Sequence, residues 1–181
     1  MARLPDPVPD LDEYGRSVYE KLKGARGEVR GMYRTMLHNP KLTEHVGNLG
    51  AYFRFKGSLL GDLRELAILA TARGTGVVYE WLMHLEPARK AGLPDEVVEE
   101  LLHGNPDTSE IDPLYREAWR VANHVVAQEV IPEDLQNSLI ERIGTAQVVE
   151  LVAVCGFYRF IGCFAVGFDV QLPDYDPPLP F

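Results

Sequence analysis

Two side chains near the middle of the sequence could exchange protons with a bound substrate. Glu80 and His84 are four residues apart, so on a helix they would be neighbours on one face. Burial and nearby charges shift the pKa values of carboxyl and imidazole groups, so such a pair can hold and pass a proton near neutral pH. The spacing also fits a solvated pair on a helix surface, although the intervening Trp81, Leu82 and Met83 make full exposure less favourable. We therefore predict that Glu80 and His84 are catalytic.

A further carboxylate comes from the helix that is expected to precede this pair. The run from Leu66 to Ala72 carries no charge, and a helix that is apolar all round is usually buried. Glu65 opens this run and shares a face with Ile68 and Leu69, so its carboxylate is predicted to point toward the core. The alternative is an acid that merely stabilises the start of the helix through the helix dipole.

Other kinds of chemistry find little support in the sequence. Two ligands on one helix do not make a metal site, so no metal is predicted. There is no Gly-rich phosphate loop and no G-x-S-x-G motif. Cys155 and Cys163 lie eight apart on one expected helix, too far for a disulfide, and we interpret them as core cysteines. The remaining histidines are scattered and are interpreted as structural or surface residues: His38, His45, His103 and His124.

The elements that must position these residues are all expected to be helices. The chain has 181 residues, a length that fits one domain over 1–181. No strand-like alternation or hairpin signal occurs, so we predict an all-α single-domain bundle of about eight helices. An extended arm (1–11) and a Pro-rich tail (169–181) flank it. Helices are expected near 12–23, 29–38, 40–55, 63–72, 77–91, 94–104, 112–128, 132–144 and 145–168, with Thr75 as an N-cap, a bend or stop at Pro87 and Gly92 as a C-terminal cap.

The last expected helix raises the question of a membrane span. Between Leu151 and Phe168 the only charge is Arg159, which would cost ~2.5–3.5 kcal/mol at the centre of a bilayer. We interpret the segment instead as a helix buried on all sides. In a domain of this size such burial requires a second subunit, so we predict a homo-oligomer.

Composition limits the partners and the compartment. The net charge is −9, which argues against nucleic acid or an anionic membrane as the main partner. The N-terminus has no apolar region typical of a secretory signal, and two cysteines are not a disulfide framework. A cytoplasmic protein whose main partner is neither nucleic acid nor a membrane is therefore predicted.

The central stretch resembles the carboxymuconolactone decarboxylase and alkylhydroperoxidase D-like (AhpD-like) family. The resemblance depends on Arg64–Leu69, on the break at Arg73–Gly76, and on Tyr79-Glu80-Trp81 followed by His84. It extends more loosely to most of the chain. It implies an all-helical AhpD-like fold assembled as a trimer or hexamer, with a pocket near a subunit interface.

The resemblance also distinguishes two branches of the family. The peroxidase-like branch begins the second helix with Cys-x-x-Cys, whereas the corresponding positions here hold Val77 and Glu80. The decarboxylase-like branch has a Tyr-Glu pair before the histidine, which Tyr79 and Glu80 resemble. The expected chemistry is thus acid/base chemistry rather than thiol chemistry, and needs no cofactor.

The function that the resemblance implies is decarboxylation or proton transfer on a small carboxylated lactone or keto acid. His84 or Glu80 would move the proton, and Glu65 would orient His84. Tyr79, Trp81 and Arg73 are expected to bind substrate, with Arg159 as another candidate for its carboxylate. The alternatives are a non-catalytic helical oligomer that binds a small molecule and, with least support, an alkylhydroperoxidase-type peroxidase.

Overall fold

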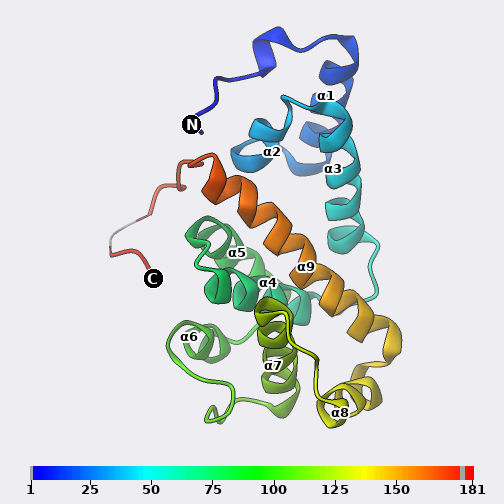
Figure 1. The fold of residues 1–181 in the computed structure, drawn as a ribbon, viewed down its shortest axis with the longest axis vertical. Coiled ribbons are helices and arrows are strands. Elements are labelled where there is room, and N and C mark those ends of the chain that lie inside the picture. The colour runs from blue at the N-terminus through cyan, green and yellow to red at the C-terminus, as the bar shows by residue number, and fades with distance from the viewer. Residues whose placement is uncertain (1, 176–177) are drawn as a thin grey trace. The chain divides into compact units, whose positions relative to one another are not determined.

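The computed structural model describes residues 2–175 and 178–181, apart from the side chain of Arg26. These residues form nine α-helices and one short 3-10 turn, and none of them forms a strand, which confirms the all-α prediction. The helices are α1 (Glu13–Arg26), α2 (Gly31–Met36), α3 (Pro40–Phe55), α4 (Gly61–Thr75), α5 (Val78–Ala91), α6 (Asp95–His103), α7 (Pro113–Ala127), α8 (Glu133–Ile143) and α9 (Thr145–Gly167), and the turn η1 is Val8–Asp10 (Figure 1).

The chain divides into two compact units. The larger unit contains Ser58–Gly162 and Leu172–Phe181, and the smaller one contains Met1–Gly57 and Cys163–Gln171. The single domain over 1–181 stays a prediction, since α9 runs through both units.

Helix α4 is the central helix of the larger unit. Helices α5, α6 and α7 pack on it, and its side chains from Glu65 to Ala72 are all buried. This explains why the stretch is apolar on every face: each face meets another helix. Only the short turn at Gly76–Val77 separates α4 from α5, so the start of α5 lies next to the end of α4.

The first part of α9 packs along α4 in the same direction. Glu150 accepts hydrogen bonds from the backbone N–H and the hydroxyl of Ser58, at 2.8 Å and 2.9 Å. Farther along, the Cys155 thiol lies 4.0 Å from the carbonyl of Ala67. A Cβ on Gly162 would lie 2.9 Å from Val77 Cγ2, so only glycine allows this close approach.

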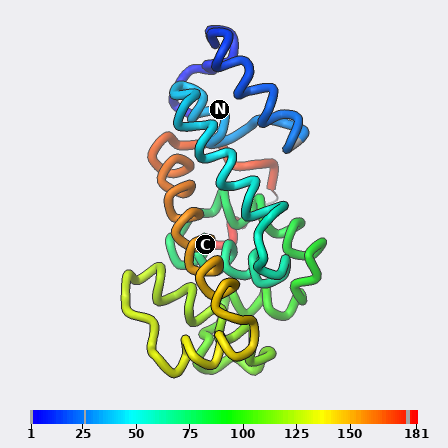
Figure 2. The backbone as a smooth tube through the Cα atoms, turned by 90° about the vertical axis from the view of Figure 1, so that its right-hand side faces the viewer, coloured from blue at the N-terminus to red at the C-terminus, as the bar shows by residue number. Residues whose placement is uncertain are grey.

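The smaller unit is built on α1 and α3, which lie side by side in blue and cyan in Figure 2. Asp12 caps α1 by accepting from the N–H of Gly15, and Leu22 packs over Gly47 of α3. The arm over 1–11 is not fully extended as predicted. Residues Val8–Asp10 form the turn η1 after Pro7, and Pro9 in its first turn has a fixed φ that suits a helical conformation.

The predicted N-cap of the second central helix is wrong. Thr75 does not cap α5 but ends α4, where its hydroxyl bonds to the carbonyl of Thr71 at 2.7 Å. The helix then stops at Gly76, which adopts a left-handed conformation at φ 69°. At Pro87, where a bend or a stop was predicted, α5 does not stop: it continues to Ala91 and ends at Gly92 in a left-handed conformation, which confirms Gly92 as the predicted C-terminal cap.

The last helix is exposed along part of one face. α9 is long and apolar enough to cross a membrane, and 56% of its most apolar window is buried within the chain. The prediction of burial on all sides is wrong for one chain, because Val149 and Phe160 remain exposed. Cys155 is buried, whereas Cys163 is exposed and is not a core cysteine as predicted.

The C-terminal tail contacts its own chain. Phe181 packs edge-on against Trp81, with ring centroids 5.6 Å apart. The guanidinium of Arg73 lies over the same Phe181 ring at 5.1 Å. The tail over 169–181 was predicted to be extended, and its residues 176–177 lie outside the described residues.

Candidate functional site

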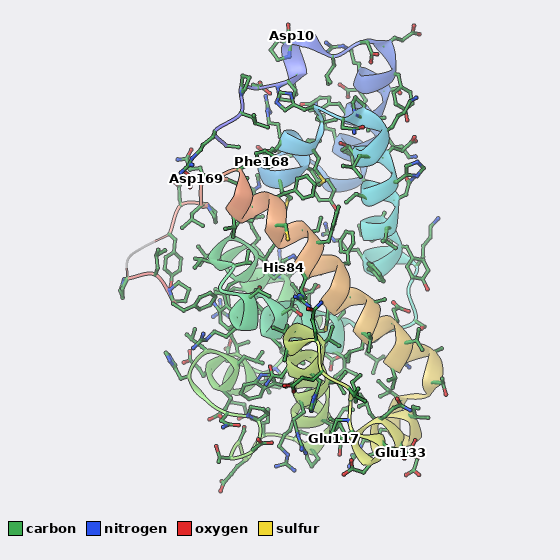
Figure 3. The ribbon with its side chains drawn as sticks, viewed as in Figure 1. Asp10, His84, Glu117, Glu133, Phe168 and Asp169 are labelled. Atoms are coloured by element: carbon green, nitrogen blue, oxygen red, sulfur yellow. The ribbon has the colours of Figure 1, made fainter. Side chains whose placement is uncertain are left out.

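The predicted acid and base residues meet inside the larger unit. Glu65 projects from α4, and Glu80 and His84 project from α5, which packs against α4. Glu65 and Glu80 are buried at 3% and 1% exposure, and the His84 side chain is 14% exposed. Figure 3 shows His84 among the helices of this unit. The solvated surface pair that the spacing also allowed is therefore excluded.

The His84 ring lies between the two carboxylates. Its Nδ1 atom is 2.7 Å from Glu65 Oε2, a short hydrogen-bond distance. Its Nε2 atom is 3.7 Å from Glu80 Oε2, too far for a direct hydrogen bond but close enough for a strong electrostatic interaction. One carboxylate thus faces each ring nitrogen.

The Arg64 guanidinium adds a positive charge next to Glu65. Arg64 Nε and Nη2 both donate to Glu65 Oε1, each at 3.2 Å. Burial on its own raises the pKa of the Glu65 carboxyl, but the hydrogen bond and charge of His84, with Arg64 beside it, lower this pKa below its ordinary value of 4.5. Glu65 is therefore ionised at neutral pH.

An ionised Glu65 determines how His84 can work. A carboxylate can only accept, so Nδ1 carries the proton of this hydrogen bond. Nε2 is then the nitrogen that can gain or lose a proton, and it is the one that faces Glu80. A carboxylate that fixes a histidine tautomer in this way is a common supporting arrangement around reactive histidines.

Tyr158 of α9 forms another wall of the site. Its ring centroid is 4.9 Å from that of His84, and the two rings are nearly perpendicular at 87°. Tyr158 is 9% exposed. The sequence analysis missed this residue, although a signal was present: Glu150, Val154 and Tyr158 recur at helical spacing on the buried face of α9.

The predicted substrate-binding residues are placed differently. Tyr79 and Trp81 are buried on α5, and Trp81 contacts Phe181. Arg73 donates through Nε to the carbonyl of Leu102 at 3.0 Å and stacks on Phe181. Arg159 donates to the carbonyl of Val125 at 3.0 Å. The structure thus brings Glu65, Glu80 and His84 together, and Arg64 and Tyr158 contact this group. Arg73 instead contacts Leu102 and Phe181.

The described residues contain no group of three or more His, Cys, Asp or Glu side chains arranged to hold a metal ion. The three acid and base residues of this site meet in pairs around the imidazole rather than converging on one point. The arrangement is suited to holding and moving a proton at His84 Nε2.

Comparisons with known proteins find a family model that is similar to the stretch holding these residues. Residues 40–123 match the family model described as "Carboxymuconolactone decarboxylase family", a stretch that includes Arg64, Glu65, Glu80 and His84. No curated protein sequence matches the chain.

Solved structures share the whole fold. A crystal structure of the alkylhydroperoxidase AhpD core, an uncharacterized peroxidase-related protein from Ralstonia eutropha JMP134, is similar at a TM-score of 0.78 and 20% identity, covering 96% of this chain and 93% of that one. A peroxidase-related protein from Silicibacter sp. TM1040 is similar at a TM-score of 0.75 and 16% identity, covering 94% and 91%. The debrominase Bmp8, as a variant bound to 2,3,4-tribromopyrrole, is similar at a TM-score of 0.71 and 16% identity, covering 87% and 84%.

At these identities the structural similarity concerns the fold, while the family model matches the stretch that holds the acid and base residues. Residues 40–123 of this chain are similar to the carboxymuconolactone decarboxylase family, and the chain has the AhpD-like helical fold.

Proposed function

We propose that this protein is an enzyme that performs cofactor-free acid/base chemistry on a small carboxylated lactone or keto acid, by decarboxylation or proton transfer. The observation that carries the proposal is the buried imidazole of His84, which Glu65 orients through Nδ1 while Glu80 faces Nε2. Nothing in this set needs oxidation or reduction to act. Imidazole and carboxyl groups are the side chains that most often serve as general acids and bases.

In the decarboxylation reaction, the bond between the carboxylate carbon and its neighbour breaks and carbon dioxide leaves. The electron pair moves into an adjacent carbonyl and gives an enolate. His84 Nε2 or Glu80 then delivers one proton to the carbon that lost the carboxylate. Water returns a proton to that group, so each turnover consumes one proton and leaves the protein unchanged.

Glu65 would act on the substrate only through His84. Because it is ionised and bonded to Nδ1, it fixes the ring orientation and stabilises the positive charge that forms when Nε2 is protonated. Glu65 is therefore a positioning residue in this proposal, and Glu80 and His84 are the catalytic residues.

A peroxidase-type activity has less support in the structure. The position of the second thiol in the peroxidase-like pattern holds Glu80, and a carboxylate cannot form a disulfide. Cys155 is buried against Ala67, and burial raises the pKa of its thiol to about 11, so it is not a ready nucleophile. The similar fold of Bmp8, a debrominase, shows that related folds host other reactions on small molecules.

We also propose that the protein is a homo-oligomer, a trimer or a hexamer. Val149 and Phe160 are exposed at 63% and 40%, and with Ala153 and Gly156 between them they lie on one face of α9. An apolar face of this kind is typical of a subunit contact. Light scattering after gel filtration tests this, and a monomeric wild type at micromolar concentration would contradict it.

The enzymatic proposal is tested by carbon dioxide release and by ultraviolet loss of substrate, over a panel of carboxylated lactones and β-keto acids. We expect His84→Ala and Glu80→Gln to lower turnover by about a hundredfold or more, the usual contribution of general acid–base groups. Two control variants match these residues in type outside the site: His124→Ala, whose imidazole pairs with Glu129, and Glu86→Gln, whose carboxylate pairs with Lys90.

The controls should keep the wild-type rate, and circular dichroism should be unchanged in all four variants. Absence of turnover on the whole panel, or equal turnover in His84→Ala and wild type, would contradict the proposal. In the first case a non-catalytic protein that binds a small molecule becomes the better explanation.

A further inference from the structure

Arg64 is the arginine that contacts the acid/base cluster directly. Its Nε and Nη2 atoms donate to one and the same oxygen, Glu65 Oε1. Among the residues that the structure describes, no hydrogen-bond acceptor is paired with Arg64 Nη1. The side chain is 17% exposed, so the guanidinium is mostly buried but still accessible.

The unused edge of this guanidinium has the shape that a carboxylate fits. A guanidinium carries five N–H groups in a planar fork, and the Nη1/Nη2 edge can donate two parallel hydrogen bonds to one carboxylate. Gly61 lies beside this edge: a Cβ built on Gly61 would lie 3.6 Å from Nη2, so glycine at position 61 leaves space there that a larger residue would fill.

An acidic substrate also needs a positively charged side chain near this cluster. Glu65 and Glu80 are both carboxylates, so a substrate carboxylate close to them meets repulsion unless a positive group faces it. Arg73 and Arg159 are each committed to a backbone carbonyl, of Leu102 and Val125 respectively. Arg64 is the arginine in contact with Glu65, and Glu65 joins it to His84.

We infer that Arg64 binds the carboxylate of the substrate through its Nη1/Nη2 edge, while Nε and Nη2 stay bonded to Glu65. This inference depends on the proposed function, because it concerns the substrate of that same site. The sequence analysis expected Arg73 to bind the substrate; this inference assigns that role to Arg64, which contacts Glu65.

The competing explanation is that Arg64 only holds Glu65 in place. In that case replacing Arg64 would change turnover equally for substrates with and without the carboxylate. The two explanations therefore differ in how a substitution affects an acid relative to its ester.

The kinetic experiment compares wild type, Arg64→Met and Arg64→Lys on the best substrate of the panel. We expect KM to rise by about tenfold to a hundredfold in Arg64→Met, the usual effect of losing a hydrogen bond to a charged group. Arg64→Lys keeps the charge without the fork and should recover part of this loss. Arg120→Met, which removes an arginine paired with Asp107, is the matched control and should keep the wild-type KM.

A binding experiment decides the inference without any turnover. Isothermal titration calorimetry would use paraconate, a stable γ-lactone carboxylate, and its methyl ester. Wild type should bind the acid at least about tenfold more tightly than the ester, and Arg64→Met should remove this preference. Equal binding of acid and ester by wild type, including binding of neither, overturns the inference, as does an unchanged preference in Arg64→Met.

The two failures can be told apart. If wild type turns over a substrate but KM is unchanged in Arg64→Met, the inference fails and the proposed function stands. If no substrate turns over, the proposed function fails, and the calorimetry still shows whether Arg64 binds the carboxylate. Should Arg64→Met be unfolded by circular dichroism, the same comparison is made with Arg64→Lys, which should weaken the preference for the acid.

Discussion

His84 and Glu65 are joined across two helices by a contact of 2.7 Å between Nδ1 and Oε2. Because Glu65 is on α4 and His84 is on α5, this one contact links the register of the two helices to the orientation of the imidazole. The carboxylate is buried and ionised, so it holds Nδ1 protonated and leaves Nε2 for chemistry.

This contact predicts a pH-dependent stability. Burial alone raises the pKa of Glu65, but His84 and Arg64 lower it below 4.5 in the folded protein. Its contribution is thus fully present above the ordinary value and is lost as the pH falls through the lowered folded-state value. We expect Glu65→Gln to reduce the free energy of unfolding by about 1–3 kcal/mol at neutral pH.

Urea unfolding from about pH 7 to about pH 3 checks this prediction. The gap between wild type and Glu65→Gln should be constant above the ordinary pKa of 4.5 and should shrink at lower pH. Glu86→Gln, which removes a fully exposed acid on α5, should show a much smaller gap. A gap for Glu65→Gln that does not change with pH would contradict the charge-based explanation.

The Tyr158 ring is predicted to position His84 by packing. Tyr158→Phe keeps the ring that meets His84 edge to face and should leave the ¹⁵N chemical shifts of the His84 ring close to those of wild type. Tyr158→Leu removes the aromatic contact, worth about 0.5–1.5 kcal/mol beyond its buried area, and should shift these signals and lower kcat severalfold.

Nuclear magnetic resonance of ¹⁵N-histidine protein measures the ring directly, independently of substrate. The prediction is wrong if Tyr158→Leu leaves both His84 signals unchanged while the protein stays folded.

Gly162 is predicted to be required for stability because it contacts Val77, the residue just before α5. A Cβ there would lie 2.9 Å from Val77 Cγ2, so Gly162→Ala should lower the free energy of unfolding by about 1–3 kcal/mol through overpacking. The double variant Gly162→Ala with Val77→Ala should regain part of that loss, because the clashing methyl groups are gone.

Gly24 of α1 provides the control. No atom lies within 4 Å of a Cβ built there, so Gly24→Ala should be neutral or stabilise by up to about 1 kcal/mol through helix propensity. Thermal or urea unfolding of the three variants measures the differences. Equal effects of alanine at both positions would show that the Val77 contact is unimportant.

The two cysteines should differ strongly in reactivity. Cys163 is exposed and should react with a thiol reagent in the native protein. Cys155 is buried, with its pKa raised to about 11, and should react only on unfolding. Thiol counting before and after addition of denaturant checks this, and rapid native labelling of both would overturn it while reviving a role for Cys155 in thiol chemistry.

Several parts of the site could be predicted from the sequence because they depend on local spacing. Glu80 and His84 are neighbours by helix geometry alone, and the uncharged run after Glu65 indicated that its helix is buried. The sequence could not show which ring nitrogen each carboxylate faces, because that depends on the register between α4 and α5. Tyr158 was missed for the same reason: it reaches His84 from a helix far along the chain.

The errors at the helix ends also have physical causes. Gly74 was interpreted as part of a break, but it lies inside α4, where a Cβ would be 3.1 Å from Val126. It is glycine because another side chain packs closely there. Threonine is a residue type favoured at N-caps, yet the Thr75 hydroxyl donates to the carbonyl of Thr71 in the preceding turn. Tertiary packing, which local patterns do not encode, decided both positions.

The carboxylate at position 80 has a consequence for the conditions under which the protein can work. A centre built on a thiol pair must be reduced again after each turnover and is lost when the thiol is over-oxidised. Carboxylates and an imidazole need neither an electron donor nor protection from peroxide. With Glu80 facing His84 Nε2, the acid/base chemistry proposed for this site would not depend on a supply of reductant.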